Sequence, residues 1–145
     1  MNIPERIAIH HSASPRGTRF NQVRQWHLDR GWKDIGYNHI ILGNGQHCPG
    51  RIVPTLAAAV ARKNRGTLSV LVMGDNTKTA QRWTQNQVSA LVKYVNACIM
   101  IWPGLRNQVF GHRDIAHENH PTLCPGLDIQ DLADTHNWNV HSYWS

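Results

Sequence analysis

Residues 68–73 read LSVLVM, an almost continuous apolar run near the middle of the chain. A short apolar run of this kind is typical of a strand that is buried on both of its faces. Such a strand lies inside a sheet that other elements cover on both sides. The run therefore predicts a central strand.

Further strands are predicted on both sides of this run. Ile7 and Ile9 alternate with smaller or polar residues, which favours a strand over residues 6–10. The sequence GNG at residues 43–45 is typical of a hairpin turn between two strands. The other predicted strands occupy residues 36–42, 46–48 and 108–111.

Helices are predicted between these strands. Thr84 and Gln87 have the spacing of a capping box, and an apolar stripe with helical period follows them. Asp128 is suited to cap the last helix. Trp26 is expected in the core, and residues 75–82 are expected to form a surface loop. The predicted helices span residues 20–30, 54–61 (a short helix or turn), 85–102 and 129–136.

This order of elements predicts an α/β fold with a central mixed β-sheet flanked by helices. The length of 145 residues fits a single domain, expected over residues 1–145 and as a monomer, with enough apolar sequence (41%) for a core. No run reaches the ~18 apolar residues of a membrane helix, so stable membrane insertion is not expected. The N-terminus lacks the apolar core of a signal peptide, so we expect synthesis in the cytoplasm.

The chain carries a net charge of +6, which favours an acidic polymer as partner. Arg62, Lys63 and Arg65 form its tightest basic group, which is short for a nucleic-acid-binding arm. A general electrostatic attraction is therefore favoured over a nucleic-acid site. The three cysteines cannot form a closed disulfide framework, which favours free thiols or a metal ligand.

The segment at residues 111–128, GHRDIAHENHPTLCPGLD, is rich in metal ligands. Histidine and cysteine are the side chains that zinc prefers, and a polar loop is a common place for a site. His112 and Cys124 need at least one more protein ligand, for which His117, His120 and the distant His10 are candidates. A catalytic and a structural zinc site both remain open. A domain with its own hydrophobic core does not need a metal ion to stabilise a loop, which favours the catalytic site.

Four blocks of the sequence, in this order, resemble the zinc-dependent N-acetylmuramoyl-L-alanine amidases. That family includes amidase-type lysozymes of bacteriophages and peptidoglycan recognition proteins. The resemblance covers about residues 6–128 and implies one catalytic amidase domain without a separate cell-wall-binding module. The blocks are IHHSAS at residues 9–14, VRQWHLDRGWKDIGYNHIILGNGQHCPGR at 23–51, GHRDIA at 111–116 and TLCPGLD at 122–128.

The resemblance also implies the roles of individual residues. The implied zinc ligands are His10, His112 and Cys124. Tyr37 matches the tyrosine beside the metal-bound water, and Thr122 matches a position that holds lysine in some members. Both are expected to assist catalysis by hydrogen bonding. Asp114 is expected to orient the metal ligands without binding the metal itself. The implied reaction is hydrolysis of the amide bond between N-acetylmuramic acid and L-alanine in bacterial peptidoglycan.

Substrate contacts are less well defined by the sequence. Relatives often carry a histidine before the central strand, but residues 56–65 contain none, so a substrate contact is either missing or supplied elsewhere, for instance by Arg62 or Lys63. His11 is expected to be structural, to support a metal ligand, or to contact substrate. The chain is interpreted as a phage or prophage endolysin that reaches the cell wall after release. The alternatives are a non-catalytic peptidoglycan-binding module and a basic nucleic-acid-binding protein with a structural zinc.

Overall fold

A computed structural model describes residues 3–52 and 57–138 of the chain. Its centre is a five-stranded mixed sheet in the order β3-β2-β4-β1-β5. The hairpin strands β2 and β3 pair antiparallel, and the other neighbours pair parallel. Every residue of β4 is buried, so the prediction of a central strand is confirmed. The strands are β1 (Arg6–His11), β2 (His39–Ile41), β3 (His47–Pro49), β4 (Thr67–Val72) and β5 (Val109–Gly111).

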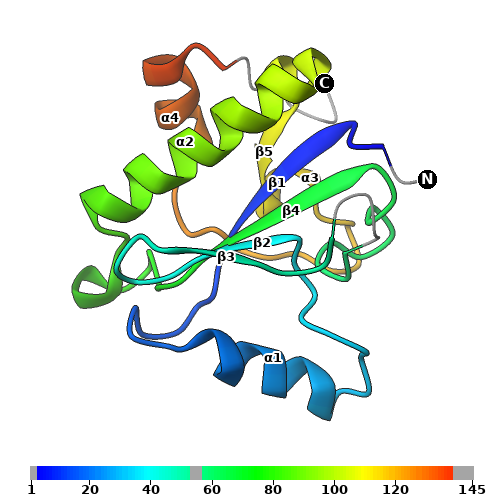
Figure 1. Cartoon of the computed structure of the whole chain (residues 1–145), viewed down its shortest axis with the longest axis vertical. Helices are drawn as coiled ribbons and strands as arrows, with labels where there is room; N and C mark the ends of the chain where they lie inside the picture. Colours follow the sequence, from blue (N-terminus) through cyan, green and yellow to red (C-terminus); the bar gives the residue numbers. More distant parts are fainter. Residues whose placement is uncertain (1–2, 53–56, 139–145) are drawn as a thin grey trace.

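Helices α2 (Gln85–Ile101) and α4 (Ile129–His136) cover one face of the sheet (Figure 1). The face beneath them is apolar because alternate residues of the strands, such as Ile9 and Val70, point toward it. The predicted capping box at the start of α2 is confirmed, since Oγ1 of Thr84 accepts a hydrogen bond from the backbone N–H of Gln87. This helical layer leaves the other face of β1 and β4 available for the site.

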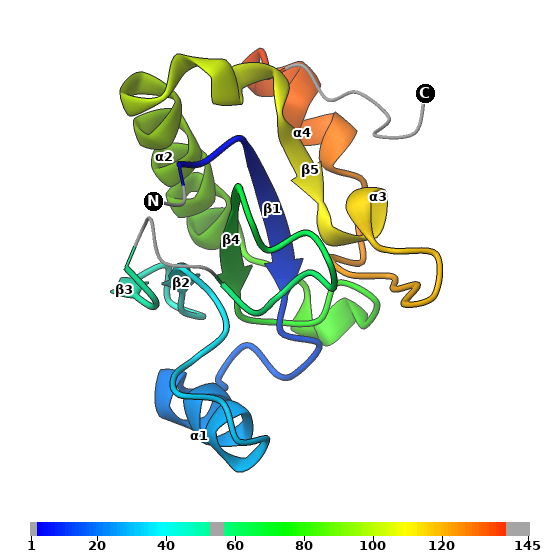
Figure 2. The same cartoon turned by 90° about the vertical axis from the view of Figure 1, so that its right-hand side faces the viewer.

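The opposite face is covered by shorter pieces. Val23 of α1 (Phe20–Asp29) packs against Ile40 and Leu71 near the carboxyl ends of β2 and β4. Helix α3 (His112–Ile115) follows β5 directly and lies beside β5, which is an edge strand of the sheet, as Figure 2 shows. Two short 3-10 helices complete the described elements, η1 (Thr79–Gln81) and η2 (Pro103–Asn107).

The structure corrects two predictions about these shorter pieces. Trp26 is 46% exposed and lies outside the core, because α1 turns Val23 and His27 inward instead. Residues 57–61 form bends and a turn rather than a helix. The side chain of Asn64 accepts hydrogen bonds from the backbone N–H groups of Ala59 and Val60 there, which satisfies donors outside a helix. The rest of that predicted helix, residues 54–56, lies outside the described residues.

In the predicted surface loop at residues 75–82, residues 77–80 and 82 are exposed as expected, but the first two residues are buried. Asp75 and Asn76 are each 6% exposed, and η1 occupies the end of the segment. Across residues 3–52 and 57–138, no helix has both the length and the hydrophobicity to cross a bilayer. The buried amide of Asn76 contacts the loop that carries Cys124.

Candidate metal centre

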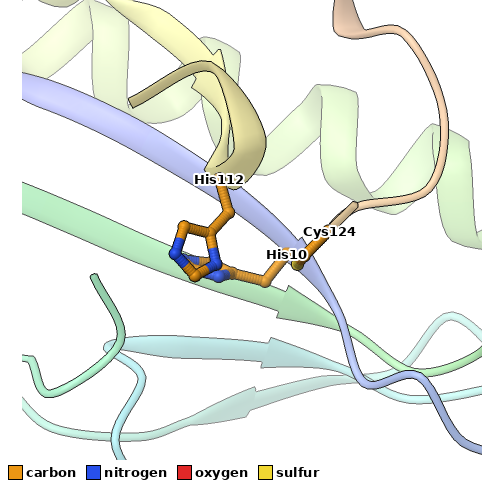
Figure 3. Close-up of side chains that lie close together, drawn as sticks. All are labelled: His10, His112 and Cys124. Carbon is orange, nitrogen blue, oxygen red and sulfur yellow. The ribbon is translucent and has the colours of Figure 1, made fainter. Parts of the chain in front are cut away.

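Three parts of the chain meet where β1 and β5 end. Alternation along β1 turns His10 toward the face opposite α2, and His112 is the first residue after β5. Cys124 reaches the same point from a loop, and its Sγ accepts a hydrogen bond from the backbone N–H of His11 at 3.3 Å. One donor atom from each of His10, His112 and Cys124 lies within 4.8 Å of the other two (Figure 3).

The surroundings set the protonation of these three side chains. Burial, and then repulsion from His112 and His11, holds the pKa of His10 well below its usual range. Burial alone lowers the pKa of His112 to about 4. Both imidazoles are therefore neutral near pH 7, which is the form that binds metal. Burial raises the pKa of the Cys124 thiol to about 12, against a smaller opposing effect of the His11 N–H.

A zinc ion fits this set of donors. Two neutral imidazoles and a thiol that a cation would deprotonate form a common zinc-binding combination. Donors around a tetrahedral zinc ion lie roughly 3.4 Å apart, given zinc–ligand distances of about 2.0–2.3 Å, so donors that lie within 4.8 Å of one another need to approach by at most about 1.4 Å. His112 and Cys124 are only partly buried, so a fourth position can face solvent. An open fourth position is characteristic of catalytic zinc sites.

Two neighbouring side chains contact His10. Nε2 of His10 lies 3.2 Å from the Ser69 hydroxyl on β4, and this contact leaves Nδ1 for a metal ion. The ring of Tyr37 meets the ring of His10 edge to face at a centroid distance of 5.1 Å. Burial, followed by repulsion from the charge that Cys124 carries once it is deprotonated, raises the pKa of Tyr37 above its usual value. Its phenol therefore stays protonated and can donate a hydrogen bond.

Thr122 and Asp114 stabilise the backbone around the ligands. Oγ1 of Thr122 accepts a hydrogen bond from the backbone N–H of Cys124 at 3.1 Å, and its own hydrogen remains available to another acceptor. Oδ2 of Asp114 accepts from the backbone N–H of Gly111 at 2.9 Å. Gly111 precedes His112, so this contact fixes the start of α3 and the direction in which His112 leaves the sheet.

Comparison with known proteins identifies the family. The profile of the N-acetylmuramoyl-L-alanine amidases matches residues 1–127. This chain belongs to that amidase family. Within it, the endolysin of Enterobacteria phage K11 is 29% identical over 117 residues, which cover 79% of this chain and 74% of the endolysin. Peptidoglycan-recognition protein SC1a of Drosophila melanogaster is 31% identical over 152 residues, covering 94% and 71% of the two chains.

Solved structures agree on the fold of this amidase-family domain. The N-acetylmuramoyl-L-alanine amidase LysC from Clostridium intestinale URNW superimposes with a TM-score of 0.82. The match covers 94% of this chain and 87% of LysC at 20% sequence identity. The predicted α/β architecture, a mixed sheet flanked by helices, is therefore confirmed by the structure and by its similarity to this solved amidase.

The other predicted site residues of this amidase-family chain are not members of the three-residue cluster. His11 points to the opposite face of β1 from His10 and is 7% exposed. Its Nδ1 accepts a hydrogen bond from the backbone N–H of Asn76 at 3.2 Å, a position that favours the structural role. Nη1 of Arg62 lies 3.3 Å from Nε2 of His117. The carbonyl of Lys63 accepts a hydrogen bond from the hydroxyl of Thr67.

The structure does not bring the alternative histidine ligands into the cluster. The rings of the half-buried His117 and the exposed His120 lie 6.2 Å apart, centroid to centroid. Within the described part of the chain, the only group of three or more metal-binding side chains consists of His10, His112 and Cys124. A separate cleft of about 540 Å³ is lined by residues 16–20, residues 42–44 and Gln81. None of the three cluster residues lines this cleft.

Two residues that support the centre were missed by sequence reasoning. Ser69 is a polar residue within an apolar strand, which by itself is a weak indication of function. In the sheet, Ser69 pairs with Ala8, which shares one face of β1 with His10. Asn76 is buried, and its Nδ2 donates to the carbonyl of Pro125, next to Cys124, at 2.8 Å. Its Oδ1 accepts from the backbone N–H of Trp83 at 3.0 Å. A polar stretch gave no hint of this buried amide.

Proposed function

We propose that this chain is a zinc-dependent N-acetylmuramoyl-L-alanine amidase. The substrate is bacterial peptidoglycan, and the bond hydrolysed is the amide between N-acetylmuramic acid and L-alanine. The observation that carries the proposal is the convergence of His10, His112 and Cys124 within 4.8 Å in a chain of this family. Zinc, when bound, polarises a carbonyl group and makes water a nucleophile near neutral pH.

The protein's own residues supply positioning and hydrogen bonds in this proposal. His10 and His112 stay neutral because they are buried, so they bind an ion without first losing a proton. The phenol of Tyr37 donates a hydrogen bond to the oxygen that gains negative charge when the amide is attacked. The hydroxyl of Thr122 donates a second one, and Asp114 keeps His112 in place through Gly111.

The endolysin relatives suggest where this activity acts. We infer that the chain is a phage or prophage endolysin that reaches the cell wall after release from the cytoplasm. The net charge of +6 supports the inference, because acidic wall polymers attract a cationic protein. Arg62 and Lys63 remain the proposed substrate contacts of the single catalytic domain.

The proposal is tested by incubating the zinc-loaded chain with purified muropeptides and analysing the products by mass spectrometry. We expect free peptides that begin with L-alanine. Cys124→Ser removes the thiolate and should abolish both zinc retention and peptide release. Cys48→Ser is the matched control, because Cys48 packs against the core around Ile40 and should leave both unchanged.

Two outcomes would reject the amidase proposal. Peptidoglycan binding without peptide release from a chain that holds zinc would favour the non-catalytic binding module. This alternative is worth testing because peptidoglycan-recognition proteins are among the relatives of the chain. Zinc retention by His10→Ala together with zinc loss from His117→Ala would favour a structural zinc within the 112–124 loop. The proposal predicts the reverse pattern for this second pair of variants.

A further inference from the structure

The hairpin β2–β3 carries two histidines that lie outside the candidate metal centre. Ile41 pairs with His47 across the hairpin, and residues 39 and 41 share one face of β2. His39 and His47 are therefore diagonal neighbours on the same face, within reach of one another. Nε2 of His39 lies 2.8 Å from Nδ1 of His47.

This pair is separate from the cluster around His10. His39 pairs with Val70 of β4, whose side chain points toward α2, whereas His10 pairs with Leu71 on the opposite face. Cys48 pairs with Ile40 and packs with it on that opposite face, so the neighbouring thiol points away from the two histidines. The two imidazoles thus form their own group on the α2 side of the sheet.

Tyr94 of α2 holds the ring of His39 in a fixed plane. The two rings stack at a centroid distance of 3.7 Å and an interplanar angle of 3°. Burial, and then repulsion from His47, lowers the pKa of His39 to about 4, so its ring is neutral near pH 7. His47 is exposed and can adjust its orientation. One ring is preorganised and neutral, and its partner is accessible from solvent.

We propose that His39 and His47 form a second metal site, which binds a divalent first-row transition-metal ion across the hairpin. Two imidazole nitrogens that bind one ion at about 2.0–2.1 Å lie roughly 3 Å apart, close to the spacing of this pair. Imidazole suits Zn²⁺, Ni²⁺ and Cu²⁺, with Cu²⁺ bound most tightly. Water completes the coordination, because Cys48 points away and Tyr94 presents its ring face.

Binding exchanges a hydrogen bond for two metal–nitrogen bonds. In the free pair one of the two facing nitrogens carries the hydrogen and the other accepts it. The ring that donates must therefore shift its hydrogen to its other nitrogen, through exchange with water at the exposed side, before both lone pairs reach the ion. An ion bound only by the folded hairpin also stabilises the fold.

The test is a calorimetric titration of the full chain with Ni²⁺ after preloading with one molar equivalent of zinc, so that excess zinc does not fill the proposed second site. Ni²⁺ is chosen because Cu²⁺ oxidises thiols and the described chain has three free cysteines. We expect one saturable Ni²⁺ equivalent in the wild type and its loss in both His47→Gln and His39→Gln. His117→Gln is the matched control, since it removes a half-buried histidine from a pair whose rings are 6.2 Å apart.

A melting curve with and without Ni²⁺ gives a second measurement. Ni²⁺ should raise the Tm of the wild type and of His117→Gln, and should leave His47→Gln unchanged. His47 is exposed, so this variant should fold even if His39→Gln does not. Absence of Ni²⁺ binding in the wild type, or equal binding by His47→Gln, would overturn the proposal. Release of zinc during titration, read with a metal indicator, would identify exchange at the His10 cluster instead.

Discussion

The hydroxyl of Ser69 contacts the imidazole of His10 from the neighbouring strand. A group that holds the second nitrogen of a metal-binding histidine fixes the ring orientation and its tautomer. Ser69→Ala removes this contact at 3.2 Å inside the sheet. We expect zinc affinity to fall by about 10–100-fold, measured by competition with a chelator of known affinity.

Ser12→Ala is the control for Ser69→Ala. The Ser12 hydroxyl also lies beside β1 and accepts a hydrogen bond, at 2.9 Å, from the backbone N–H of Gly74. Its loss should lower the free energy of unfolding by about 1 kcal/mol and leave zinc affinity unchanged. Equal zinc affinities of Ser69→Ala and the wild type would show that the hydroxyl does not orient His10.

Tyr37 can be tested without disturbing the packing of His10. Tyr37→Phe keeps the edge-to-face ring contact and removes only the phenol. If the phenol donates to the developing oxyanion, kcat should fall by about 10²–10³-fold while zinc content stays at one equivalent. Kinetics on a soluble muropeptide at saturating zinc measure this. A variant with wild-type kcat would exclude the phenol from the proposed catalysis.

At the scale of elements, Asn76 connects the loop that carries Cys124 to the start of α2. Asn76→Ala would leave the carbonyl of Pro125 and the backbone N–H of Trp83 without these side-chain partners. Unpaired buried groups are costly, so we expect the free energy of unfolding to fall by about 2–4 kcal/mol in urea titration. Faster zinc release should accompany it, because the Cys124 loop loses an anchor.

Asn44→Ala separates this effect from the loss of a loop amide in general. Oδ1 of Asn44 accepts a hydrogen bond from the backbone N–H of Gln46 within the exposed hairpin turn. Its replacement should lower stability by less than Asn76→Ala and leave zinc release unchanged. If both variants release zinc at the same rate, Asn76 does not anchor the Cys124 loop.

Elements with strong local signals could be predicted from the sequence. The apolar run gave β4, and Thr84 with Gln87 gave the start of α2, because strand burial and helix capping depend on nearby residues. Residues 57–61 were mispredicted because a side chain, that of Asn64, binds the backbone donors that a helix would use. Helix α3 is too short for a periodic pattern to reveal it.

At the scale of the whole molecule, the site depends on contacts that no local pattern contains. The motifs indicated His10, His112 and Cys124, and the structure brings them together across the chain. Ser69 joins them only through the parallel register of β1 and β4, in which Ala8 pairs with Ser69. The motifs therefore sufficed to select the three side chains that converge, whereas the contact of Ser69 with His10 required the sheet order.

The stability of the whole molecule should also report the burial of His27. Its Nδ1 accepts a hydrogen bond from the backbone N–H of Gly36 at 2.8 Å. Burial, followed by the charges of Arg30 and Arg51, lowers its pKa from 6.5 to about 4. The unfolded chain thus binds this proton more readily, so the stabilisation is complete above pH 6.5 and declines as pH falls toward 4.

This decline can be measured by comparing the wild type with His27→Gln in urea titrations, on metal-free chains, between pH 7.5 and 4.5. The glutamine carbonyl can accept the Gly36 hydrogen bond but does not titrate. Wild-type stability should fall over this range by up to about 3 kcal/mol more than that of the variant, since each pKa unit corresponds to about 1.4 kcal/mol. Parallel pH profiles for the two chains would mean that His27 takes up its proton without opposing the fold.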